Sequence, residues 1–347
     1  MTKLFLLILI LVATTIILLE IILRKSEKLN LIADSKDLKA SDEKQRKKVT
    51  DFTESLKTLE LQHGHVNQLH ISQVSFSSQS LNFVDGWRLT THPPIDPNSN
   101  IFVFGGSTIQ CLEVSDQFTI CSVLQRTVNQ NGMLARVHNR GVSGMTVKAS
   151  FDLLTSTQIS AKDCIVFYFG VNDSKLDTYL QKAIAPFSLI PGYIKILGGL
   201  RILLKLRIAE WLWLETVKPA DRTVVNARAN ATKVAKTLQE ARDYVTNNGA
   251  MFFAILQPNI FTKKNYTIQD HEISKRSKIN PRIVKLQYLE YLNVLNGKNW
   301  FRQLTDAIDQ HEKSPYLDWN HLDQSGNEII ANKIFKLIET ELVPKQR

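Results

Sequence analysis

The run Ile101-Phe102-Val103-Phe104-Gly105-Gly106-Ser107-Thr108 places four apolar residues directly before two glycines and a serine. The apolar residues predict a buried strand, and the residues after them predict a helix. Two glycines let the backbone turn sharply between the two elements. Ser107 is therefore expected at the carboxyl end of a strand and the amino end of a helix. There its hydroxyl is exposed and backbone N–H groups can stabilise a negative oxygen, although such turns also serve as plain helix caps.

Outward from this run, short apolar segments alternate with amphipathic ones. Further strands are predicted at residues 136–139, 164–169 and 250–256, each preceded by a helix-like stretch, the clearest at 229–246. A final helix is predicted at 326–341, capped by Asp323 or Ser325. This alternation predicts an α/β fold built around a parallel sheet.

Two more blocks follow predicted strands directly. Gly144 lies in the block that starts at Asn139, and Asn172 lies in Gly170-Val171-Asn172-Asp173. A glycine can bring a bare backbone N–H close to a reacting carbonyl, and an asparagine offers a side-chain N–H₂ donor. Glycine, asparagine and aspartate also dominate ordinary turns, which is the plain alternative for each block.

A fourth block, Asp318-Trp319-Asn320-His321-Leu322, precedes the last predicted helix. In one tight turn, a carboxylate three residues before a histidine can hold its imidazole, while the other ring nitrogen takes a serine proton. In a doubly wound sheet the strand ends gather at one edge, so all four blocks are expected to converge. The other histidines are interpreted as structural or simply exposed.

These four blocks, in this order, resemble those of the SGNH (GDSL-like) hydrolases. The resemblance implies a three-layer α/β/α, flavodoxin-like fold over roughly residues 82–342, in a domain expected to span 78–347. It assigns Ser107 as nucleophile, Asp318 and His321 as the rest of a triad, and Gly144 and Asn172 as oxyanion donors beside the Ser107 amide. Gly106 replaces the aspartate found in much of the family, which we expect to be tolerated because that aspartate is not a triad member.

The amino terminus predicts a membrane anchor. Residues 4–23 are almost continuously apolar, and about 20 such residues can cross a bilayer. No small-residue cleavage site follows, so we expect an uncleaved transmembrane helix at 1–24 and a charged helical stalk at 25–77. Arg24, Lys25 and Lys28 after the span favour a cytoplasmic carboxyl side, but large domains can translocate despite such flanks, so the orientation stays open.

A segment at about 187–217 does not fit the alternation. It is rich in Ile, Leu and Trp, is interrupted by Pro191 and by Gly198-Gly199, and carries four basic residues. The segment is interpreted either as an insertion that meets lipid or covers an acyl pocket, or as a pair of buried helices.

Composition excludes several classes of protein. The formal charge is +10, but basic residues are dispersed among acidic ones, so nucleic acid is not expected as a partner. Three cysteines allow at most one disulfide and have no metal-type spacing. No metal or other cofactor is required by the predicted chemistry.

The sequence therefore predicts a membrane-anchored serine esterase that acts on small-molecule, glycan or lipid esters, with O-acetyl carbohydrate esters first. The alternatives are an O-acyltransferase that uses the same site, a lipase acting at its own membrane, and a non-catalytic membrane scaffold.

Overall fold

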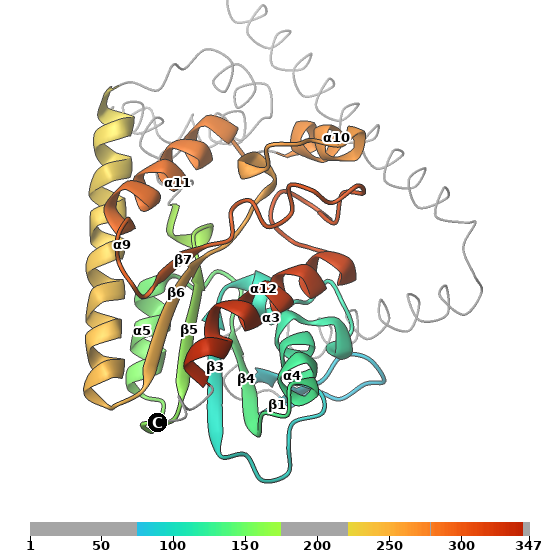
Figure 1. The fold of residues 1–347 in the computed structure, drawn as a ribbon. Helices are drawn as coiled ribbons and strands as arrows, with labels where there is room; N and C mark the ends of the chain where they lie inside the picture. The colour runs from blue at the N-terminus through green and yellow to red at the C-terminus, as the bar shows by residue number, and fades with distance from the viewer. Residues whose placement is uncertain (1–74, 175–220, 278, 343–347) are drawn as a thin grey trace, which may run out of the picture. The chain divides into compact units, whose positions relative to one another are not determined.

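The computed structural model describes residues 75–174, 221–277 and 279–342. Its centre is a sheet in which every neighbouring pair of strands is parallel (Figure 1). The strands are β3 (Ser99–Gly105), β4 (Ala135–Gly141), β5 (Cys164–Phe169), β6 (Met251–Leu256) and β7 (Phe301–Gln303). Their spatial order is β4-β3-β5-β6-β7. Counted along the chain this is the order 2-1-3-4-5 of a flavodoxin-like, doubly wound sheet.

Burial explains why these strands were predictable. All six residues of β5 are buried, as are the last five of β3 and of β6. Strands covered on both faces read as continuous apolar runs, and each of these runs ends near a glycine or a polar turn. The four predicted strands and the parallel α/β class are confirmed.

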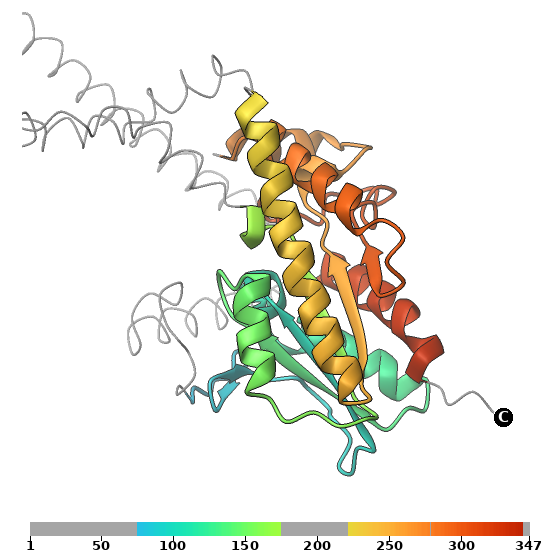
Figure 2. The same ribbon diagram turned by 90° about the vertical axis from the view of Figure 1, so that its left-hand side faces the viewer.

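Helices cover both faces of the sheet, which gives three layers (Figures 1 and 2). One face carries α4 (Ile120–Gln130) and α12 (Gln324–Leu342), which pack against each other. The other carries α5 (Val147–Thr155) and α9 (Asp221–Asn247), which also pack together.

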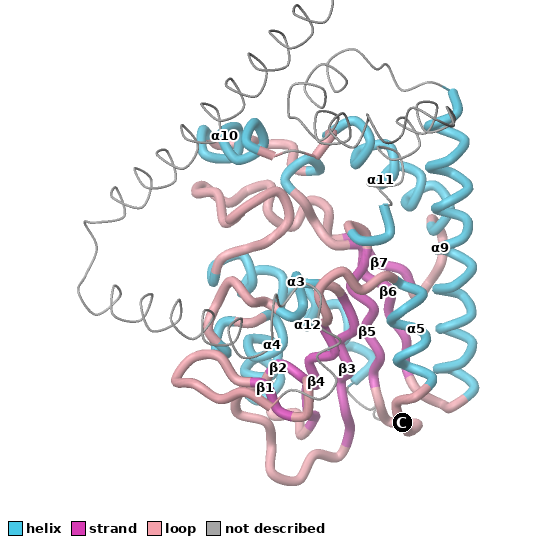
Figure 3. Tube along the Cα trace, turned by 180° about the vertical axis from the view of Figure 1, so that it is seen from behind, coloured by secondary structure: helices cyan, strands magenta, loops and turns pink. Residues whose placement is uncertain are grey.

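Smaller elements complete the described fold. Helix α11 (Pro281–Leu295) packs on α9, and α10 (Ile268–Arg276) lies with it beyond the carboxyl ends of the strands (Figure 3). Strands β1 (Phe83–Val84) and β2 (Trp87–Arg88) form a separate antiparallel pair. The connecting turns are η3 (Asp116–Phe118), η4 (Asn172–Ser174) and η6 (Ile260–Thr262).

The helix after Ser107 differs from the expectation. It is a single turn, α3 (Ser107–Gln110), and a loop separates it from α4. Cys111 ends it by adopting a left-handed backbone conformation with φ 53°, from which an α-helix cannot continue. The sequence pattern does not reveal this stop, because Cys111 is neither glycine nor asparagine.

Three predicted segments lie outside the described residues: the anchor at 1–24, the stalk as far as residue 74, and the insertion at 187–217. Within 75–174, 221–277 and 279–342, no helix combines the length and the apolar character that crossing a membrane requires.

Candidate active site

Ser107 begins helix α3 directly after strand β3. Gly106 occupies the position before the helix, and its carbonyl accepts hydrogen bonds from the N–H groups of Ile109 and Gln110. The Ser107 amide thus belongs to the first turn of a helix, whose N–H groups have no partner within the helix. This is the position that the sequence predicted for the serine.

Ser107, His321 and Asp318 form a continuous chain of hydrogen bonds. The Oγ atom of Ser107 lies 2.8 Å from Nε2 of His321, and Nδ1 of His321 lies 2.7 Å from Oδ2 of Asp318. With Nδ1 donating to the carboxylate, Nε2 carries the lone pair and accepts from the serine hydroxyl. The structure thus brings together three residues from two regions far apart in the sequence.

The turn before α12 holds the histidine in place. Oδ1 of Asp318 accepts hydrogen bonds from the backbone N–H groups of Asn320, at 2.9 Å, and His321, at 2.8 Å. Asp323 then caps α12, since its carboxylate accepts from the Gly326 N–H at 2.9 Å. Asp318 therefore orients both the backbone and the ring of His321, and the cap is Asp323 rather than the alternative Ser325.

The charges in this chain favour an ion pair between the base and its carboxylate. Burial alone would lower the pKa of His321, but the hydrogen bond to Asp318 and the negative charges of Glu113 and Asp318 outweigh it, so that pKa is raised above its ordinary value. Burial alone would raise the pKa of Asp318, but the hydrogen bond and charge of His321 lower it overall. Asp318 therefore remains ionised where His321 titrates.

Asn172 lies beside the nucleophile turn. Its side-chain Nδ2 donates to the Met145 carbonyl at 3.0 Å, so the loop after β4 orients an amide that belongs to the end of β5. A Cβ atom on Gly106 would lie only 2.0 Å from that Nδ2. The absence of a side chain at residue 106 thus lets Asn172 approach the residue next to Ser107.

Gly144 lies in the same loop after β4. Its φ of 76° is in the left-handed region, and a Cβ there would meet open space. The loop is held against β3, since Val142 donates its N–H to the Gly105 carbonyl at 3.0 Å. Gly144 is therefore placed near the serine turn on a backbone conformation that favours glycine.

The strand order explains the convergence. Ser107 follows β3 and Asn172 follows β5, and these two neighbouring strands flank the point where the order of connections reverses. Ligands of doubly wound sheets bind in the crevice outside the strand ends at this switch point.

Sequence reasoning missed one charged residue of the site, Glu113. Its Oε1 lies 3.6 Å from Nε2 of His321. Glu113 and His321 line a cavity of about 10 Å³, which is room for about one water. No motif marks Glu113, because the loop that carries it follows an unexpectedly short helix.

The described residues contain no group of three or more His, Cys, Asp or Glu side chains that could hold a metal ion. All three cysteines are buried and free. Burial raises the pKa of Cys111 to about 12, so its thiol is not a thiolate nucleophile near neutral pH.

No family model and no curated protein matches the chain. Several solved structures resemble it. A lipase/acylhydrolase from Enterococcus faecalis is 17% identical with a TM-score of 0.41, and the match covers 72% of this chain and 100% of that one. An acetyl-xylooligosaccharide esterase from Geobacillus is 14% identical with a TM-score of 0.40, over 70% and 95%. A lipolytic G-D-S-L family protein from Veillonella parvula is 15% identical with a TM-score of 0.37, over 70% and 98%. At this degree of likeness, a function has to be argued from the site itself.

Proposed function

We propose that the chain is a serine esterase of the SGNH (GDSL-like) type, with Ser107 as nucleophile, His321 as base and Asp318 as the carboxylate that orients it. The observation that carries the proposal is the pair of hydrogen bonds, 2.8 Å from Ser107 to His321 and 2.7 Å from His321 to Asp318. A nucleophile, a base and an orienting carboxylate in hydrogen-bond reach are the parts that acyl transfer requires.

In the first half of the reaction His321 takes the hydroxyl proton at Nε2. The Oγ of Ser107 forms a bond to the ester carbonyl carbon, and the carbonyl π electrons move to its oxygen. When the tetrahedral intermediate collapses, the alcohol leaves with the proton from Nε2. A water then repeats the sequence on the acyl-enzyme, releases the acid and restores the serine.

The oxyanion is held by three donors: the N–H of Ser107, the N–H of Gly144 and the side-chain amide of Asn172. An amide nitrogen carries two hydrogens. One is donated to the Met145 carbonyl, which leaves the second for the oxyanion. Donors that are oriented before the reaction stabilise developing charge without a reorganisation cost.

The substrate we propose has a short acyl group, with O-acetyl carbohydrate esters first. The hollow that the described residues leave beside His321 measures about 10 Å³. This hollow is too small for a long alkyl chain, and its lining mixes polar Thr108, Glu113 and Asn320 with apolar Ile120, Tyr168 and Leu322.

The proposal includes attachment to a membrane through residues 1–24. It rests on the length and apolar character of that run in the sequence. A membrane-attached esterase would meet its substrates at a surface.

The test compares hydrolysis of p-nitrophenyl acetate, butyrate and octanoate by the wild type and by Ser107→Ala. We expect turnover of the acetate, with kcat reduced by about three orders of magnitude or more in the variant. The butyrate and octanoate should be progressively poorer substrates of the wild type.

Equal turnover by the two proteins would overturn the proposal. A different outcome would indicate an O-acyltransferase at the same site: Ser107 becomes acylated, no free acid is released, and the acyl group is transferred to an added sugar alcohol. Preference for octanoate would contradict the short-acyl substrate and favour a lipase.

A further inference from the structure

Glu113 presents a second carboxylate to the catalytic histidine. Asp318 occupies the Nδ1 side of His321, and Glu113 lies near Nε2, where its Oε1 is 3.6 Å away. The Glu113 side chain is 28% exposed, so it is shielded from most but not all solvent. The atom it faces is the one that exchanges a proton with Ser107 in the proposed reaction.

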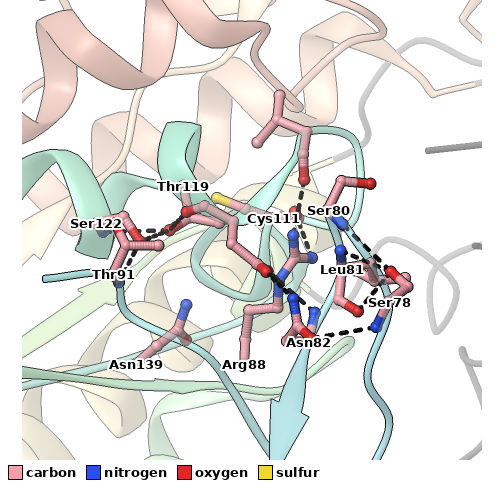
Figure 4. Close-up of polar contacts among 12 residues, drawn as sticks. Ser78, Ser80, Leu81, Asn82, Arg88, Thr91, Cys111, Thr119, Ser122 and Asn139 are labelled. Carbon is pink, nitrogen blue, oxygen red and sulfur yellow. Dashed lines mark hydrogen bonds and ion pairs between the residues drawn. The ribbon is translucent and has the colours of Figure 1, made fainter. Parts of the chain in front are cut away.

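A buried ion pair fixes the loop that carries Glu113. The guanidinium of Arg88, on β2, donates to the carbonyls of Cys111 at 3.1 Å and Val114 at 2.8 Å, on either side of Glu113 (Figure 4). Its Nε donates to Asp116 at 2.7 Å. The Arg88 side chain has no exposed surface.

Asn82 completes this network (Figure 4). Its backbone N–H and its side-chain amide both donate to the carboxylate of Asp116, at 3.1 and 2.5 Å. The Asp116 carboxylate therefore has its hydrogen-bond donors in Arg88 and Asn82. Glu113 takes no part in the Arg88–Asp116 ion pair that holds its loop. Buried groups with several specific bonds tolerate little displacement, so the core holds the backbone on either side of Glu113.

Three other charged groups act on the Glu113 carboxyl: His321 and Asp318 from the turn before α12, and Arg88 from β2. The buried Cys111 thiol lies in the same loop, and the charge of Glu113 adds to the rise in the pKa of that thiol. Burial raises the pKa of Glu113, while the charge of His321 opposes that rise. In return, the charge of Glu113 contributes to raising the pKa of His321.

We propose that Glu113 is a positioning residue of the reaction, an electrostatic partner of His321 that stabilises the proton which Nε2 takes from Ser107. This inference rests on the proposed function. As the serine attacks, the Oγ–H bond breaks, its electron pair forms the bond to the carbonyl carbon, and the proton moves to Nε2. Glu113 receives no proton: its carboxylate attracts the new N–H until Nε2 passes that proton to the leaving alcohol.

A carboxylate beside Nε2 also has a cost. With His321 neutral, the lone pair of Nε2 faces a negative oxygen, which is unfavourable, and protonation of the ring removes this repulsion. Glu113 therefore favours the imidazolium, the form that exists in the transition state of acyl transfer.

The experiment measures the pH dependence of kcat/KM for p-nitrophenyl acetate with the full chain, comparing wild type with Glu113→Gln. Glutamine keeps the size of the side chain and removes its charge. We expect the midpoint of the acidic limb to fall by on the order of one pH unit and the plateau to fall by roughly tenfold. Glu113→Asp keeps the negative charge but shortens the side chain by one methylene. It should recover part of the midpoint and part of the plateau.

Glu328→Gln is the matched control. Glu328 is exposed on α12, so this variant removes one negative charge from the helix that follows His321 without touching the site. Its pH profile should coincide with that of the wild type. A Glu113→Gln protein with an unchanged melting temperature and an unchanged midpoint would overturn the inference.

An NMR titration of the His321 ring separates this inference from the proposed function, since it needs no turnover. The signal of His321 is the one that disappears in His321→Gln. A lower imidazolium pKa in Glu113→Gln supports the inference even if Ser107 proves inactive, and an unchanged pKa contradicts it even if the esterase activity is established.

Discussion

At the scale of a single residue, the absence of a side chain at Gly106 leaves space for the Asn172 amide beside Ser107. Its backbone, with φ −82°, is open to any amino acid, so no turn requires glycine here. The requirement comes from Asn172, whose Nδ2 would lie 2.0 Å from a Cβ at this position. Gly106 is therefore coupled to the placement of the proposed oxyanion donor.

We expect Gly106→Ala to lower kcat for p-nitrophenyl acetate by about 10²- to 10³-fold, the range for loss of one oxyanion donor. The fold should persist, because the clashing atom is the end of a side chain that can rotate away. Steady-state kinetics and a thermal melt measure the two effects.

A double variant locates the cause. In an Asn172→Ala background, Gly106→Ala should add almost no further loss, since the two changes remove the same donor. Gly132→Ala is the control: with φ 71° and open space around it, it should cost about 1–2 kcal/mol of stability but leave kcat unchanged. Full activity in Gly106→Ala would show that Asn172 does not act from this position.

At the scale of an element, the loop between α3 and α4 depends on a cation from β2. We expect Arg88→Ala to lower the free energy of unfolding by about 3–5 kcal/mol, because Asp116, whose side chain is 8% exposed, would keep a buried charge without its partner. Urea denaturation gives the difference.

The comparison for this change is Arg242→Ala, in the exposed pair that Arg242 forms with Asp243 on α9. Surface pairs contribute little, so its cost should stay below about 1 kcal/mol. Similar small losses in both variants would mean that Arg88 does not hold the loop.

The elements that could be predicted are those whose sequence carries a periodic pattern. Strand β5 is a run of six buried residues, and α9 and α12 repeat apolar residues at helical spacing. Strands β2 and β7 could not be found, because they have two and three residues, too few for any period. Trp87 and Arg88 pair with β1 directly after the turn at Asp85 and Gly86, and the turn residues Asp85 and Gly86 are all that the local sequence marks there.

At the scale of the whole molecule, the order of strands was not readable from local sequence. Three of the blocks could be placed at a strand end and the fourth before the last helix, and the structure brings Ser107, Asp318 and His321 into contact as expected. Their catalytic roles stay a prediction. Glu113 and Arg88 were missed for one reason: each matters through contacts with residues distant in the chain, and nothing in their own neighbourhood distinguishes them.

The proposed site and the network behind it lie entirely within the described residues. We therefore expect a fragment of residues 75–347 to hydrolyse p-nitrophenyl acetate with the kcat/KM of the full chain. A fragment of residues 99–347 loses β1, β2 and Arg88, and circular dichroism should show it unfolded. A folded but inactive 75–347 fragment would mean that the earlier residues contribute to the chemistry.

The central claim is that His321 and Asp318 activate Ser107, and covalent labelling tests it most directly. An alkyl fluorophosphonate should form one adduct, found by peptide mass spectrometry on Ser107 and absent in Ser107→Ala. In Asp318→Asn, the one side-chain oxygen of the asparagine would keep accepting from the backbone N–H groups of residues 320 and 321, so its NH₂ group would face Nδ1 of His321. Nδ1 would then have to accept a hydrogen bond, which moves the ring proton to Nε2 and leaves no base for Ser107. Labelling should slow by about 10⁴-fold. Asp323→Asn, which keeps its cap, should label at the rate of the wild type. An adduct on another residue, or equal rates in Asp318→Asn and the wild type, would contradict the account.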